Sequence, residues 1–187
     1  MNVSENTFNI PQISNEQYEL VESSNPVLHT ATEKFNFSDP PIHPVELYNI
    51  LGNKLREHDG LGLAAPQLGL PYNFFVIRSD PVQGFFNANV VDTSEEEVIL
   101  EEGCLSYPGL VLKVKRPKLI RIRFSDPEGN TKTAKYQDFT ARIIQHEIDH
   151  INGIVFSDRV SRLSLEMAIK KTNKKGYHYK IGDFYAR

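Results

Sequence analysis

Two histidines four residues apart, His146 and His150, with Glu147 directly after the first, are the residues of this chain best suited to chemistry. On an α-helix, residues i and i+4 lie on one face, so both imidazoles can reach one divalent ion. The carboxylate between them would face the open coordination position of that ion and could act as a base. The spacing therefore predicts a catalytic metal centre with its own proton acceptor.

The stretch around these histidines has the pattern of an amphipathic helix. Ile144, Ile148 and Ile151 recur at helical spacing, roughly opposite the two histidines, and Gly153 supplies a helix stop. The pattern predicts a helix that buries its isoleucines and turns the histidines toward an ion.

An ion held by two histidines needs a further protein ligand. The extended zinc-protease motif would place a histidine at position 156, but that residue is Phe156, which excludes the family. Glu166 is an alternative ligand on a following helix. Cys104, the only cysteine in 187 residues, is the stronger candidate, because a thiolate binds soft metals well and Gly103 lets another backbone approach.

These three ligands would leave one position open for water, which is typical of a catalytic centre. One thiolate and two neutral imidazoles suit Fe²⁺, Zn²⁺, Co²⁺ or Ni²⁺. A third segment, residues 60–69, adds two glycines around Leu61 and an uncharged amide donor, Gln67, that could polarise a carbonyl. This segment is not a dinucleotide fingerprint, because the third glycine is missing and a helical stretch, rather than a strand, leads into it.

Together the three segments resemble the peptide deformylase family, which removes the formyl group from the N-terminal formylmethionine of new polypeptides. The family motifs G-x-G-L-A-A-x-Q, E-G-C-L-S and H-E-x-D-H appear without a substitution at residues 60–67, 102–106 and 146–150. The similarity looks continuous from about residue 20 to about residue 159. The resemblance implies a metal-dependent hydrolase whose substrates are N-formylmethionyl nascent peptides.

The resemblance also implies roles for individual residues. The metal ligands would be Cys104, His146 and His150, with Fe²⁺ as the ion and Zn²⁺, Ni²⁺ or Co²⁺ able to substitute. Glu147 would accept a proton from metal-bound water and later deliver it to the leaving amine. The oxyanion would lie between the metal, the side-chain amide of Gln67 and the backbone N–H of Leu105.

Substrate contacts carry over from the family less directly than the metal ligands. The substrate backbone would add as an extra strand along Leu61 and Gly62 on one side and Gly103 on the other. The methionine side chain would be bound by Leu61, Phe139, Ile143 and Tyr107. Asp149 is expected to fix the ligand helix through a hydrogen bond to an imidazole or an ion pair with a nearby cation, and the candidate cations are Arg121, Arg123 and Arg142.

The composition indicates an ordinary globular protein. The net charge of −3 gives no sign of a nucleic-acid site, although four lysines cluster near the C-terminus, Lys170, Lys171, Lys174 and Lys175. Their expected role is the solvated face of a helix, with transient docking onto the ribosome as the alternative. No apolar run is long enough to span a membrane and no signal peptide is visible. A single cysteine suits a reducing compartment, so the cytoplasm is expected, with an organelle or the host of a virus as alternatives.

The elements that must position these residues are a helix, several strands and the histidine helix. An amphipathic stretch opens at Pro44 and ends near Gly60, and the strand-like runs are 74–78, 85–91, 98–101, 110–114, 119–124 and 131–136. The last two runs are expected to form a hairpin. The prediction is an α+β fold with mostly antiparallel strands packed around a central metal-binding helix. Residues 1–19 are predicted as a polar, mobile arm and residues 20–187 as a single catalytic domain.

Two other functions are compatible with part of the pattern. A metalloprotease that uses Glu166 would leave Cys104 uninvolved. A catalytically silent, metal-stabilised binding protein would have no need of the base Glu147 or the donor Gln67.

Overall fold

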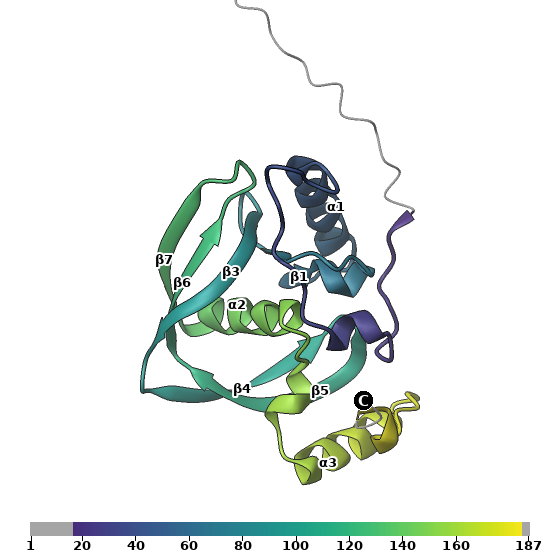
Figure 1. Cartoon of the computed structure of the whole chain (residues 1–187). Helices are drawn as coiled ribbons and strands as arrows, with labels where there is room; N and C mark the ends of the chain where they lie inside the picture. The colour runs from purple at the N-terminus through teal and green to yellow at the C-terminus, as the bar shows by residue number, and fades with distance from the viewer. Residues whose placement is uncertain (1–16, 185–187) are drawn as a thin grey trace, which may run out of the picture.

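Two antiparallel sheets lie on either side of one central helix, α2 (Figure 1). The computed structural model describes residues 17–184. Its helices are α1 (Pro44–Glu57), α2 (Asp138–Ile151) and α3 (Arg162–Asn173), with short 3₁₀ turns η2 (Pro26–His29), η3 (Ala65–Leu68), η4 (Phe156–Arg159) and η5 (Ile181–Phe184). Its strands are β1 (Gly62–Ala64), β2 (Phe74–Ile77), β3 (Gln83–Thr93), β4 (Glu97–Cys104), β5 (Tyr107–Pro117), β6 (Leu119–Ser125) and β7 (Thr131–Gln137).

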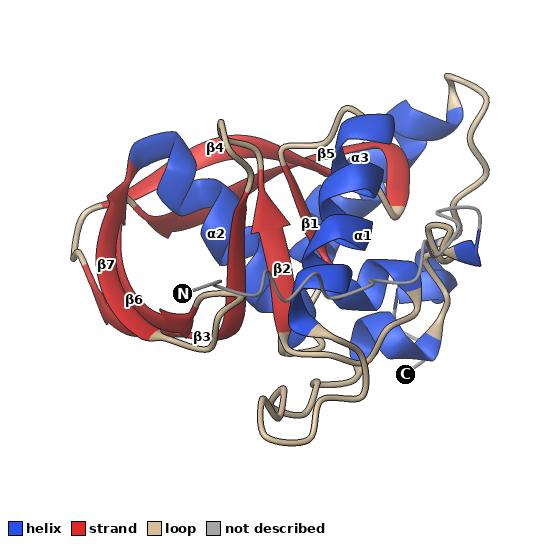
Figure 2. Cartoon of the chain, turned by 90° about the horizontal axis from the view of Figure 1, so that it is seen from above, coloured by secondary structure: helices blue, strands red, loops and turns tan. Residues whose placement is uncertain are grey.

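The larger sheet has five strands in the order β1-β2-β3-β6-β7, and the smaller sheet pairs β4 with β5. The named strands all pair antiparallel. Seen from above, β4 and β5 run past α2 on the side away from β6 and β7 (Figure 2). Strand β1 is an edge of the larger sheet and β4 an edge of the smaller one, so two free strand edges are available beside α2.

Helix α2 is buried on both faces, which is more burial than the amphipathic pattern predicts. Ile144, Ile148 and Ile151 pack into the apolar core against the larger sheet, as predicted. The opposite face, with His146 and His150, is also buried because the small sheet covers it. The helix ends as expected, since Gly153 has a left-handed φ of 69° and donates its N–H to His150 O.

The N-terminal described residues dock on α1. Tyr18 packs against the core cluster that contains Leu51 and Phe74. Glu19 Oε1 lies 2.9 Å from Nζ of Lys54, a side chain that is 2% exposed. Residues 1–16 of the expected arm lie outside the described residues, whereas Tyr18 and Glu19 contact the body of the protein.

The predicted α+β class, with mostly antiparallel strands around the histidine helix, is confirmed. Each predicted strand is present, and the hairpin between β6 and β7 forms over the full length of both strands. Strand β1 was not predicted, because three residues are too few for an alternating pattern. The lysine cluster lies at and just beyond the end of α3 with all four side chains exposed, and the helices among residues 17–184 are too short or too polar to cross a membrane.

Candidate metal centre

Cys104, His146 and His150 come together between the small sheet and α2. Cys104 is the last residue of β4, and the histidines lie one turn apart on α2. One ligand atom from each of the three lies within 4.8 Å of the others, and Cys104 Sγ is 3.3 Å from His150 Nε2. A sulfur and two imidazole nitrogens at this separation can surround one ion.

The electrostatics of the two histidines also suit a cation. Burial by itself lowers the pKa of His146, but hydrogen bonds with Cys104 and Glu102 outweigh it and raise that pKa well above its ordinary value. The environment of His146 thus favours positive charge, whether a proton or a metal ion supplies it. Burial lowers the pKa of His150, which favours the neutral imidazole that metal binding requires.

A buried polar atom beside the three ligands, Glu147 Oε2, has no hydrogen-bond partner among residues 17–184. Buried polar groups are normally paired, so an unpaired carboxyl oxygen at this place indicates that a further group completes the site. The residues present therefore fit a bound transition-metal ion and its water.

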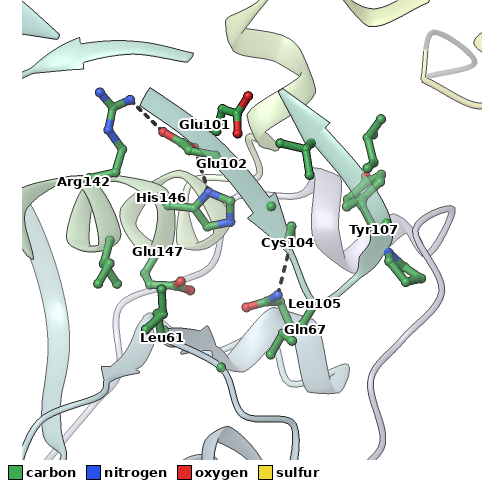
Figure 3. A pocket seen from close by; sticks show the side chains of 18 of the residues that line it. Leu61, Gln67, Glu101, Glu102, Cys104, Leu105, Tyr107, Arg142, His146 and Glu147 are labelled. Atoms are coloured by element: carbon green, nitrogen blue, oxygen red, sulfur yellow. Dashed lines mark hydrogen bonds and ion pairs between the residues drawn. The ribbon is translucent and has the colours of Figure 1, made fainter. Parts of the chain in front are cut away.

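Glu102 orients the first histidine ligand. Its Oε2 accepts from His146 Nδ1 at 3.0 Å, so the other ring nitrogen of His146 is the one available to a metal beside Cys104 (Figure 3). Its two oxygens also accept from Arg116 Nε and Nη2 at 2.7 and 2.9 Å. Burial would raise the pKa of Glu102, but the bonds from Arg116 and His146 hold it well below its usual range, so the carboxylate stays charged.

The expected partners of Asp149 were wrong. Asp149 accepts from Arg116 Nη1 at 2.6 Å and also pairs with Arg159. Arg121 and Arg123 point to solvent from β6. Arg142 instead donates to Glu102 at 2.8 Å and to the carbonyl oxygens of Val98 and Val114.

Arg116 therefore links both ligand-bearing segments, and neither its role nor that of Glu102 was predicted from the sequence. A signal for Arg116 was present in β5, where buried Leu112 and Val114 alternate with exposed Lys113 and Lys115. Arg116 stands at the next position of the buried series, so the alternation along β5 predicts that its side chain points inward. Glu102 lies inside the E-G-C-L-S motif, but its chemistry depends on partners from β5 and α2.

We expect Glu102→Gln to weaken metal binding by about 10 to 100-fold, because His146 loses the carboxylate that orients it. The same change leaves Arg142 without its buried counter-charge and leaves Arg116 with Asp149 alone, so the free energy of unfolding should fall by about 3 to 5 kcal/mol. Metal titration and urea unfolding of the metal-free protein measure the two effects. The neighbouring exposed Glu101→Gln is the matched control, and equal effects of both changes would contradict the role of Glu102.

Glu147 faces the ligands from α2 with a side chain that is 3% exposed. Its burial raises the pKa of the carboxyl to about 7, so the group can both take and give a proton near neutral pH. Gln67 lies beside Cys104. Its Oε1 accepts from the Ala64 N–H at 2.9 Å, and its Nε2 lies 3.4 Å from both Cys104 Sγ and Ser106 Oγ.

A cavity of about 440 Å³ opens beside these residues. It is lined by every residue expected to contact substrate: Leu61, Gly62, Gly103, Leu105, Tyr107, Phe139 and Ile143. Leu61 and Phe139 lie at its mouth and are 45% and 53% exposed. Tyr107 differs from the others, because its ring packs into the core against Phe184 and its hydroxyl donates to Ser23 O.

Glu166, the alternative third ligand, is not near the histidines. It lies on α3 and accepts from Arg162 Nε at 2.9 Å. The group of potential ligands formed by His146 and His150 contains Cys104 and no carboxylate.

Comparison with known proteins gives consistent results. The family model described as polypeptide deformylase matches residues 17–166. The peptide deformylase of Wolbachia pipientis wMel is 38% identical over 148 residues, which cover 72% of this chain and 83% of that protein. The peptide deformylase of Borreliella burgdorferi is 39% identical over 148 residues, covering 75% of this chain and 86% of the relative.

Solved structures of peptide deformylases resemble the whole fold. One from Synechococcus elongatus in complex with actinonin has a TM-score of 0.79 and 30% identity, covering 88% of this chain and 90% of that one. Another from Thermus thermophilus has a TM-score of 0.77 and 30% identity, with 84% and 94% coverage.

Proposed function

Because the chain belongs to the polypeptide deformylase family, whose members remove the formyl group from newly made polypeptides, we propose that Cys104, His146, His150 and Glu147 form its deformylase active site. The observation that carries the proposal is the meeting of three ligand atoms within 4.8 Å beside a buried carboxyl group. The cytoplasm, where such chains are synthesised, is the proposed location.

The proposed cofactor is Fe²⁺, held by Cys104, His146 and His150, with Zn²⁺, Co²⁺ or Ni²⁺ able to replace it. The donor set of one sulfur and two imidazoles supports this group of ions, and the family resemblance favours iron. A bound divalent ion supplies a Lewis acid that polarises the formyl carbonyl and makes water a better nucleophile. Metal analysis of anaerobically purified protein identifies the ion.

Glu147 carries the proton in the proposed reaction. As water adds to the formyl carbon, one of its protons passes to the Glu147 carboxylate. The carboxyl then gives that proton to the amine nitrogen as the C–N bond breaks, and formate and the free amine leave. A pKa raised to about 7 by burial suits a group that must both accept and return a proton.

Gln67 and Leu105 are proposed to stabilise the negative charge that develops on the formyl oxygen. The amide of Gln67 is held in place because its Oε1 accepts from the Ala64 N–H, which leaves Nε2 directed toward Cys104. The backbone N–H of Leu105 follows Cys104 directly and would be the second donor.

We expect Gln67→Leu to lower kcat by about 10² to 10³-fold and to change KM less, because the lost donor acts on charge that appears only in the transition state. Steady-state kinetics on a formyl-Met peptide measure the split. A change confined to KM would mean that Gln67 contacts only the ground state.

The substrate is proposed to enter as an additional strand between the two sheets. The edge of β1 at Gly62, with Leu61 just before it, and the edge of β4 at Gly103 both line the cavity and support this mode. Main-chain hydrogen bonds would read peptides of any sequence. The formylmethionine side chain would then be recognised by Leu61, Phe139 and Ile143, together with Tyr107, and all four line the cavity.

Release of formate from a formyl-Met peptide tests the function directly. The acetylated peptide of the same sequence is the matched control, and it should be cleaved far more slowly. Cleavage of an internal peptide bond without formate would favour a metalloprotease, and binding without turnover would favour a silent binding protein.

A further inference from the structure

Gly62 faces Glu147 where strand β1 passes closest to α2. We propose that Gly62 is a positioning residue for Glu147, in addition to any contact that its backbone makes with substrate. The absence of a side chain at position 62 creates the space in which the Glu147 carboxyl lies. The inference rests on the proposed function insofar as Glu147 is the proton carrier.

The geometry leaves no room for even a methyl group on Gly62. A Cβ atom placed there would overlap Oε1 of Glu147 and would lie 2.8 Å from its Cδ and 2.9 Å from its Cγ. Non-bonded carbon atoms normally lie about 3.5 to 4.0 Å apart. Three atoms of one side chain are involved, so a small rotation of the carboxyl group alone would not relieve the overlap.

The backbone of β1 is not free to retreat from this contact. Gly62 pairs with Ile77 in the larger sheet, and Leu63, the next residue, is fully buried. On the other side of Gly62, the carbonyl of Leu61 accepts from the Arg78 N–H at 2.8 Å. Helix α2 is equally fixed, because Ile144 and Ile148 pack in the core. The side chain of Glu147 must therefore move if position 62 acquires a side chain.

One oxygen of the Glu147 carboxyl, Oε2, is buried and has no hydrogen-bond partner among residues 17–184. A carboxyl group without a protein partner on that oxygen takes its position from the surfaces that enclose it, and the Cα of Gly62 is one of these surfaces. A displacement of about 1 Å at a catalytic group can cost about 10²-fold in rate.

A second glycine of the cavity provides the contrast. Gly103 is also expected to contact the substrate backbone, but a Cβ there would come no closer than 3.8 Å to Leu110 O. Gly103 therefore has space for a methyl group in the free protein, and Gly62 does not. The two glycines share an expected substrate role and differ in their relation to Glu147.

The kinetic test compares Gly62→Ala with Gly103→Ala in the metal-loaded protein. Gly62→Ala should lower kcat by about 10²-fold or more with unchanged metal content, because Glu147 is displaced while the ligands remain. Gly103→Ala should raise KM more than it lowers kcat, because its methyl group obstructs the incoming strand. Gly182→Ala, where nothing lies within 4 Å, controls for a generic glycine replacement. A Gly62→Ala enzyme that keeps its kcat would overturn the proposal.

A stability cycle tests the same contact without turnover. Gly62→Ala should lower Tm by several degrees in the wild-type background and by clearly less in the Glu147→Ala background, because the clashing side chain is then gone. Equal losses in both backgrounds would overturn the proposal. Absence of formate release by the wild-type protein would overturn the proposed function instead, and the cycle would still decide whether Gly62 fixes Glu147.

Discussion

Replacing Glu147 with alanine is expected to leave the metal bound and to lower kcat by about 10² to 10⁴-fold, the usual contribution of a positioned proton carrier. The metal should stay because Glu147 is not among the three grouped ligand residues. Metal analysis of the purified variant, together with formate release at saturating peptide, measures both parts. Loss of the ion would show that Glu147 is a ligand, and near-normal kcat would remove it from the mechanism.

Glu147→Gln is the matched control for shape. Glutamine nearly fills the same space beside Gly62 but cannot carry the proton, so it should be about as inactive as alanine. The glutamine variant should not be less stable than the wild-type protein, because it keeps the shape of the side chain and removes a buried group that can ionise. A gain in stability with a loss of turnover is the pattern expected at a functional site.

The histidine helix could be predicted because its information is local. Ile144, Ile148 and Ile151 define one face by spacing alone, and Gly153 marks the end by its left-handed conformation. The meeting of Cys104 with His150, 46 residues apart in the chain, could not be obtained from periodicity. It followed from the chemistry of a thiolate and from the family motifs.

The pairing of the buried charges could not be predicted from the sequence. Several arginines were candidate partners of Asp149. In the structure Asp149 pairs with Arg116 and Arg159, because β5 and the turn after α2 bring these two side chains to its carboxylate. Arg142, one of the expected partners, donates to Glu102 instead. Which cation meets which carboxylate is decided by the placement of the small sheet against α2, and this depends on contacts far apart in the chain.

Position 62 is a similar case. From the sequence, Gly62 indicated only close approach of some backbone, and a substrate strand was the obvious candidate. The short strand β1, which was not predicted, also places Gly62 against Glu147. A glycine in a motif can thus serve the catalytic side chain of the same protein as well as the ligand.

Replacing Cys104 with alanine is expected to abolish both metal binding and formate release. The two remaining imidazoles are fewer than the three protein ligands that such an ion needs. An ion that binds the folded protein at 100 times its Kd stabilises it by about 2.7 kcal/mol, so added metal should raise the Tm of the wild-type protein and not that of the variant. The comparison uses thermal unfolding with and without the ion, and metal analysis after gel filtration.

The matched control for Cys104→Ala is Glu166→Ala, which removes the alternative third ligand. Glu166 pairs with the exposed Arg162, and such a surface ion pair contributes about 0 to 1 kcal/mol, so its loss should leave metal content, Tm and turnover nearly unchanged. The two variants separate the interpretations of the histidine motif, because each removes one candidate ligand from a separate element. A Cys104→Ala protein that retains stoichiometric metal, beside a Glu166→Ala protein that loses it, would place the third ligand on α3 and contradict the site described between β4 and α2.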